Sequence, residues 1–185
     1  MREVRRAGCI DSVPEFEPFK RTGRRQDVLS GEELTALFPR DPDELVRVWR
    51  RPEHMRKEQD AIPLMFGTLS CLTASAGLRS GEVRALHREQ ISVERSGLAI
   101  DRAIDDLGKV GPLKKATIND PRSRAVIIPD ITMNMLERWM LIAPHTPGDP
   151  GLLFPYHGKP IASYYLIDRL RFIYQDVDSS EMGKH

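Results

Sequence analysis

The amino-acid sequence predicts an α+β fold, a mainly helical domain with a small antiparallel β-sheet. The first indication is the stretch of residues 61–76, where apolar side chains recur at steps of three and four around most of a helical circumference. Residues 130–142 repeat this helical spacing with a stripe of methionine, leucine and tryptophan. Between these stretches the period changes, and short runs alternate in polarity or are rich in β-branched residues, which is typical of strands.

Length and charge limit how the chain is organised. Its 185 residues can bury one sizeable core, so we expect one folded domain at residues 28–175, a basic linker or arm at 1–27 and a tail at 176–185. The chain holds 28 Lys and Arg against 27 Asp and Glu, a net charge of +1. Any surface for nucleic acid must therefore be a local patch, because the whole chain is nearly neutral.

Several classes of protein are disfavoured by what the sequence lacks. Cys9 and Cys71 have no partner spacing for a metal site or a disulfide framework, which suits a reducing cytoplasm. No apolar run is long enough to cross a bilayer, and the first residues lack the apolar stretch of a signal peptide. We therefore expect a cytoplasmic protein with no metal, no small-molecule cofactor and no membrane partner.

Two short helices are expected before the central one. Ser30 and Glu33 have the spacing of a capping box, which predicts a helix that extends to Leu37. Asp41 followed by Pro42 predicts the start of another helix, because proline is favoured at the first helical position and acids are favoured in the first turn.

The strands are expected between and after the two long helices. We expect three or four of them before the second long helix, among residues 90–93, 97–102, about 113–118 and 124–129. Farther along the chain, residues 152–154 predict a short buried strand, and Ser163 is expected to open a last helix.

The turn after the central helix holds the candidate site. Gly77 stands where a helix commonly ends in a left-handed residue, Ser80 is a predicted N-cap, and Glu82 lies in the first turn of the next helix. This arrangement would hold Arg79 between two helices, where a guanidinium loses little entropy on binding two oxygens of a phosphate. The alternative is that Arg79 only pairs with Glu82 or caps the carbonyls of the preceding helix.

Residues 73–86, Thr-Ala-Ser-Ala-Gly-Leu-Arg-Ser-Gly-Glu-Val-Arg-Ala-Leu, resemble the first catalytic box of the tyrosine recombinases, the phage integrase family. The usual form of that box is T-G-L-R-x-[GS]-E. The resemblance implies that Arg79 is the first catalytic arginine, which holds the scissile phosphate, and that Glu82 supports it. Weaker resemblances extend from about Val28 to Ile173, in the helix at 30–37, the strand at 122–129 and the turn at 158–160.

The same resemblance implies a lysine on a basic β-hairpin, which protonates the leaving 5′-oxygen when a tyrosine attacks the phosphate. Lys115 is the candidate general acid, with Lys114 next. An alternative alignment puts Ile118 at the lysine position and removes the general acid, and both lysines can also be read as solvated charges. Lys114, Arg122 and Arg124 are predicted to contact the DNA backbone.

The resemblance ends before the family's His-x-x-Arg box and its C-terminal tyrosine nucleophile. The last residue is His185, and the tyrosines at 156, 164, 165 and 174 all precede the expected box, so they are read as surface or core residues. We therefore expect a catalytic domain truncated at both ends. Because the cationic groups of such a site act together, this chain alone is expected to have little or no strand-exchange activity.

Three functions stay open from the sequence. The first is a fragment of a site-specific recombinase from a bacterial or phage context. Its partner would be double-stranded DNA, with a homo-oligomer on the DNA and a 3′-phosphotyrosyl intermediate in the full-length family. The second is a catalytically inactive DNA-binding or regulatory remnant. The third is a helical protein-interaction module. The arm at 1–27 would be a solvated tail or a DNA-backbone contact.

Overall fold

The computed structural model describes residues 29–51, 59, 61–105, 108–113 and 123–182, with side chains as far as residue 173. Contacts divide the chain into one unit at Met1–Ser30 and a second at Gly31–His185. The described residues fall almost entirely in the second unit.

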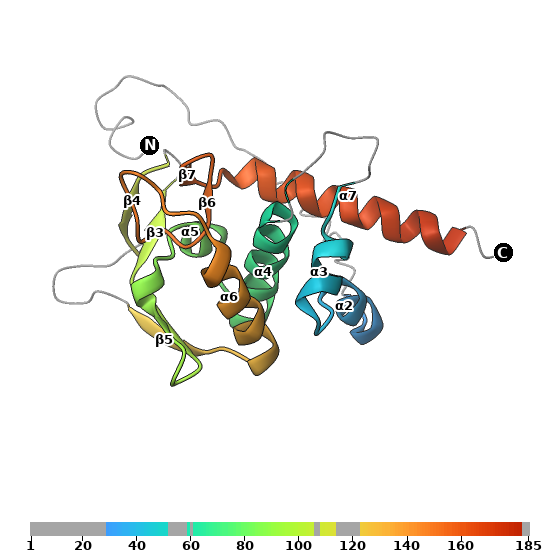
Figure 1. The fold of residues 1–185 in the computed structure, drawn as a ribbon, viewed down its shortest axis with the longest axis horizontal. Helices are drawn as coiled ribbons and strands as arrows, with labels where there is room; N and C mark the ends of the chain where they lie inside the picture. The colour runs from blue at the N-terminus through green and yellow to red at the C-terminus, as the bar shows by residue number, and fades with distance from the viewer. Residues whose placement is uncertain (1–28, 52–58, 60, 106–107, 114–122, 183–185) are drawn as a thin grey trace, which may run out of the picture. The chain divides into compact units, whose positions relative to one another are not determined.

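The second unit is a mainly helical domain with short antiparallel strands, and the predicted α+β class is confirmed (Figure 1). Its helices are α2 (Gly31–Leu37), α3 (Pro42–Val48), α4 (Ala61–Ala76), α5 (Ser80–Arg84), the 3-10 turn η1 (Arg88–Gln90), α6 (Asp130–Ile142) and α7 (Ser163–Met182). Its strands are β1 (Ile91–Ser92), β2 (Gly97–Ile100), β3 (Arg102–Ile104), β4 (Val110–Pro112), β5 (Arg124–Ile127), β6 (Pro155–Tyr156) and β7 (Lys159–Pro160).

Helix α4 is the centre of the core, and it has the bounds that the apolar spacing predicts. Most of its residues from Pro63 to Leu72 are buried, because α3 and α6 both pack against it. Gly67 permits the close approach of α3, since a Cβ there would lie 2.8 Å from Cγ of Leu45. On the α6 side, Cys71 Sγ lies 3.4 Å from Thr132 Oγ1. An all-round apolar helix is thus covered by neighbours on several faces.

The strands form a three-stranded sheet in the order β1-β2-β5 and two separate hairpins, β3–β4 and β6–β7. The single strand expected at 97–102 is wrong, because β2 and β3 belong to different sheets. Asp101 lies between them, and its Oδ1 accepts hydrogen bonds from Gln90 Nε2 at 2.7 Å and Arg102 Nε at 2.9 Å. The strand expected at about 113–118 falls mostly outside the described residues, and β4 precedes it.

The C-terminal part is tied to the core by buried side chains. Residues 152–154 are buried as expected, but the strand β6 begins only after them. Arg169 of α7 is buried, and its guanidinium lies 3.2 Å from the Trp49 carbonyl oxygen and 4.5 Å from the Phe66 ring centroid. Helix α7 continues to Met182, past the boundary predicted at residue 175.

Within the described part of the chain, none of the helices has the length and apolar character needed to span a bilayer. The same residues contain no group of three or more His, Cys, Asp or Glu side chains arranged to hold a metal ion.

Candidate nucleic-acid interface

The turn between α4 and α5 has the left-handed glycine that the sequence predicts. Gly77 has a φ of 60°, and the Leu78 amide donates to the Thr73 carbonyl at 3.2 Å, which closes the end of α4. The expected N-cap at Ser80 is wrong by one residue. Arg79 occupies that position in an extended conformation, and Ser80 is the first residue of the helix. The backbone of Arg79 is therefore fixed by two helix ends at once.

Glu82 is a buried carboxylate that accepts hydrogen bonds from Arg79 and Arg124. Its side chain is only 2% exposed, and Oε2 accepts a hydrogen bond of 2.8 Å from the Arg79 amide. The two terminal nitrogens of Arg124 donate to the two carboxylate oxygens at 2.9 and 2.8 Å, in a bidentate pair. Glu82 therefore joins α5 to β5 as well as capping its own helix.

The charges of this pair explain its protonation. Burial by itself raises the pKa of Glu82, but the hydrogen bonds from Arg124 and from the Arg79 amide outweigh it, so the pKa is lowered. The hydrogen bond to Glu82 in turn raises the pKa of Arg124. The carboxylate is thus ionised and neutralised by Arg124 within the domain.

The side chain of Arg79 is less enclosed than the sequence predicts. It is 79% exposed, and one contact of 3.4 Å joins its Nη1 to Oε1 of Glu82. The sequence left open that Arg79 only pairs with Glu82. This contact is such a pair, but it is a single long contact, whereas Arg124 makes two short hydrogen bonds to the same carboxylate. Among the described residues, most donors of the exposed Arg79 guanidinium therefore have no partner.

Of the other predicted site residues, only Arg124 lies within the described chain. Lys114, Lys115 and Arg122 fall outside it. Arg124 donates to Glu82 through its two terminal nitrogens, and its contact with DNA stays a prediction. The pair of Glu82 and Arg124 was not predicted from the sequence. Once an acid in a first helical turn is known to be buried, a nearby cation is expected, because a buried charge is costly without a partner.

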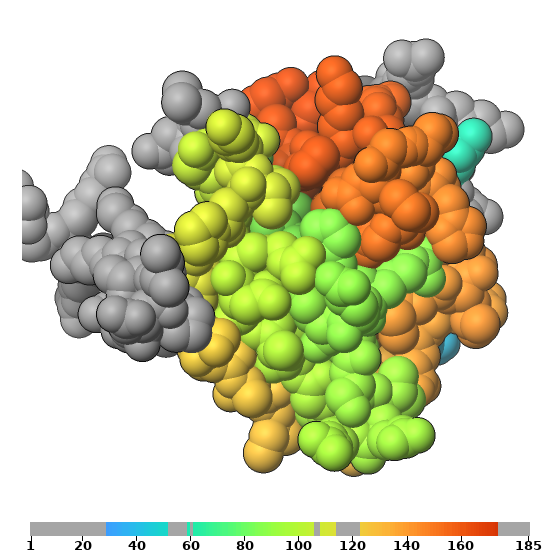
Figure 2. Space-filling view, turned by 90° about the vertical axis from the view of Figure 1, so that its left-hand side faces the viewer, coloured from blue at the N-terminus to red at the C-terminus, as the bar shows by residue number. Residues whose placement is uncertain are grey.

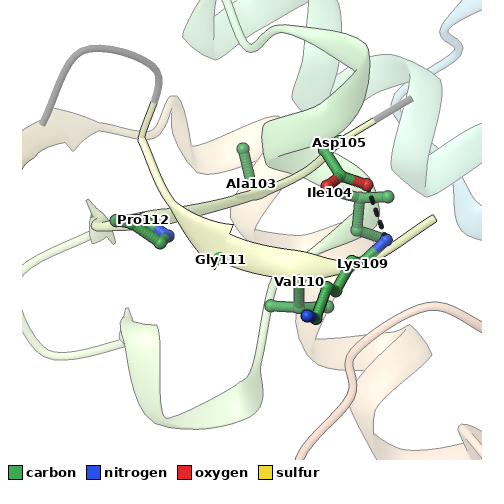
Figure 3. Close-up of a pocket in the computed structure, with 7 residues that line it drawn as sticks. All are labelled: Ala103, Ile104, Asp105, Lys109, Val110, Gly111 and Pro112. Atoms are coloured by element: carbon green, nitrogen blue, oxygen red, sulfur yellow. Dashed lines mark hydrogen bonds between the residues drawn. The ribbon is translucent and has the colours of Figure 1, made fainter. Parts of the chain in front are cut away.

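Helix α5 lies directly on the β3–β4 hairpin. A Cβ on Gly81 would lie 2.6 Å from the carbonyl oxygen of Ile104, so only glycine allows this approach. The hairpin borders an open cavity of about 590 Å³ (Figure 3). Exposed Lys109 lines it and donates through its backbone amide to Asp105 Oδ1 at 2.8 Å. This lysine brings a positive charge to the hairpin, and it was not among the site residues predicted from the sequence.

Figure 2 is a space-filling view of the side of the molecule on which the β3–β4 hairpin lies. The yellow-green surface of the β3–β4 hairpin lies next to the orange-red surface of the segment that contains β6 and β7. Three tyrosines gather at that segment: the Tyr156 and Tyr165 ring centroids are 4.8 Å apart, and those of Tyr165 and Tyr164 are 4.2 Å apart. A hydrogen bond with Tyr165 raises the pKa of Tyr164. The side chain of Tyr174 lies outside the described residues.

No protein-family model matches this sequence, and no curated protein matches it. Among solved structures, the chain is similar to the integrase of transposon Tn1549, solved in complex with a circular intermediate DNA. The TM-score is 0.63, with 10% sequence identity, over 92% of this chain. This chain therefore shares its fold with that integrase over most of its own length.

The similarity covers only part of the chain of each similar structure. This chain covers 54% of the Tn1549 integrase chain, about half of its length. A second similar structure is the site-specific recombinase XerH, bound to a palindromic difH substrate in a post-cleavage complex. Its TM-score is 0.49 at 17% identity, with 80% of this chain and 35% of that one covered. Because that score is low, the fold assignment rests on the integrase.

Proposed function

We propose that this chain binds duplex DNA as part of the catalytic domain of a site-specific tyrosine recombinase, with Arg79 on a backbone phosphate. The observation that carries the proposal is that Arg124, and not Arg79, makes the two short hydrogen bonds to the Glu82 carboxylate. Arg124 neutralises the buried carboxylate through two short hydrogen bonds, so the charge of the exposed Arg79 is left over for an external anion. Its backbone is fixed, which lowers the entropy lost on binding.

The fold supports this proposal because the similar integrase was solved with DNA. Breaking and rejoining of strands through a 3′-phosphotyrosyl intermediate is proposed for the recombinase as a whole, since this chain spans about half of that integrase. Lys115 as general acid, Lys114 and Arg122 as backbone contacts, and a homo-oligomer on DNA stay predictions.

A salt titration tests the role of Arg79. A fluorescent duplex is titrated with the chain at several salt concentrations between about 50 and 200 mM, and log K is plotted against log salt. We expect Arg79→Gln to weaken binding to every sequence and to reduce the salt slope by about one. The matched control is Arg171→Gln, which removes an exposed arginine on α7 that lies 4.0 Å from Asp168.

Two results would contradict the proposal. One is an equal salt slope for Arg79→Gln and Arg171→Gln, which would show that Arg79 contacts no phosphate. The other is the lack of salt-dependent binding by the unmodified chain.

A second candidate is a DNA-binding protein without strand-breaking activity, and the tyrosine cluster favours it. Tyr156 and Tyr165 are half-buried against each other, which limits the access of a phosphodiester to their phenols. The two candidates differ in one measurement, which is the formation of an SDS-stable adduct with a nicked suicide duplex. DNA binding without the adduct would support the second candidate, and an adduct would exclude it.

A further inference from the structure

A second cluster of arginines lies at the other end of α4. Helix α6 runs antiparallel to α4, because Thr132 near its start contacts Cys71, whereas Ile142 at its end shares a cavity with Leu64 near the start of α4. This cavity of about 300 Å³ is lined by residues of α3, α4 and α6. It is thus separated from Arg79 by the length of α4.

The cavity carries an excess of positive charge. Arg47 of α3 and Arg138 of α6 both line it, and both are exposed. Within the described residues neither side chain makes an ion pair, and Asp43 is the only carboxylate that lines the cavity. Two arginines on different helices that face one cavity are suited to hold a carboxylate between them.

The rest of the cavity lining includes apolar side chains. Leu64 is 3% exposed at the floor, and Ile142 is 45% exposed at the rim. Leu141 precedes Ile142 at the end of α6 and is 79% exposed, so two large apolar side chains lie together on the surface there. The volume lies at the lower end of the ~300–1,000 Å³ typical of small-molecule pockets, so single side chains of a partner fit better than a whole cofactor.

We propose that the groove between α3 and α6 docks an acidic amphipathic helix of a partner protein. A carboxylate of that helix would lie between Arg47 and Arg138, and its apolar side chains would cover Leu64, Leu141 and Ile142. The proposal does not depend on DNA binding, since the groove lies at the opposite end of α4 from Arg79. Partner and DNA can therefore occupy the domain together.

The test uses a synthetic amphipathic peptide with leucines on one face and glutamates beside them. A matched peptide carries lysines in place of the glutamates, and binding of each to the full chain is followed by fluorescence anisotropy. We expect saturable binding of the glutamate peptide, and binding weaker by about ten-fold or more for the lysine peptide. We expect a similar loss when Arg47→Gln and Arg138→Gln are combined.

The control is the pair Arg95→Gln and Arg171→Gln, which removes the same charge from the β1–β2 turn and from α7. It should bind the glutamate peptide as the unmodified chain does. Leu141→Gln should weaken binding several-fold, because it removes apolar contact but no charge.

Three results would overturn the proposal. They are equal binding of the two peptides, equal binding by the Arg47/Arg138 variant and its control, and displacement of the peptide by duplex DNA, which would assign these arginines to nucleic acid. The salt titration of Arg79 is independent of all three, so failure of one proposal leaves the other standing.

Discussion

The two ends of α4 present arginines in opposite surroundings. Beyond its C-terminal end, Arg124 is held by both oxygens of the buried Glu82 carboxylate. Near its N-terminal end, Arg47 and Arg138 face a cavity with an apolar floor and make no ion pair with any described residue. The difference shows that the role of an arginine depends on whether the fold gives it a carboxylate. The first arginine supports the structure, and the other two are available to a ligand.

The largest effect is expected from removing the carboxylate at the C-terminal end. Glu82→Gln leaves Arg124 without its counter-charge. We expect it to lower the free energy of unfolding by about 2–3 kcal/mol, below the ~3–5 kcal/mol of fully buried pairs because the Arg124 side chain is 37% exposed. Urea denaturation measures this loss. The control is Glu89→Gln, which breaks an exposed pair with Arg102 and should cost less than about 1 kcal/mol. Equal losses would contradict a special role for Glu82.

Acid should weaken the same end of α4. The pKa of Glu82 is lowered in the folded state, so its contribution to stability is present above the pKa of an unfolded glutamate and is lost as pH falls through the lowered value. The free energy of unfolding, measured from ~pH 6 down to ~pH 3, should therefore decrease less steeply in Glu82→Gln than in the unmodified chain. Parallel curves for the two proteins would show that Glu82 does not titrate in this way.

A smaller effect is expected from moving α5 away from β3. Gly81→Ala places a methyl group 2.6 Å from the backbone oxygen of Ile104, and it should destabilise the domain by about 1–3 kcal/mol. The matched control is Gly111→Ala in β4, where no heavy atom lies within 4 Å of the added Cβ. If thermal unfolding of the two variants is the same, the contact between α5 and β3 has no effect on stability.

The smallest changes in the free energy of unfolding are expected from replacing Arg124 or Arg138 by lysine. Arg124→Lys keeps the charge but loses the bidentate geometry, so we expect a loss of about 1–2 kcal/mol in the free energy of unfolding. Arg138→Lys should stay within about 0.5 kcal/mol, because no described residue pairs with Arg138. A loss of equal size at both positions would remove the contrast between the two ends of α4.

Local patterns predicted the elements that surround the candidate site. The apolar spacing of residues 61–76 and 130–142 gives the bounds of α4 and α6, since helical periodicity is a property of neighbouring residues. Gly77 was predicted as a left-handed helix end for the same reason. The contact between the Arg79 and Glu82 side chains follows from their spacing of three residues, which brings side chains together at the start of a helix.

Contacts between distant residues could not be predicted in this way. Arg124 lies 42 residues from Glu82, and nothing in its own strand distinguishes an arginine that pairs with an acid from one that faces a phosphate. The separation of β2 and β3 was not predicted, because the Asp101 side chain between them binds Gln90, which lies outside residues 97–102.

The two long helices and the glycine turn that carries Arg79 were predictable from the sequence, because they depend on residues within a few positions of one another. Which arginines are neutralised and which are exposed depends on tertiary packing. A charge takes its role from whatever packs against it, and the fold brings those neighbours from α3, α5, α6 and β5. The same residue type therefore stabilises the domain at Arg124 and remains open to an anion at Arg79.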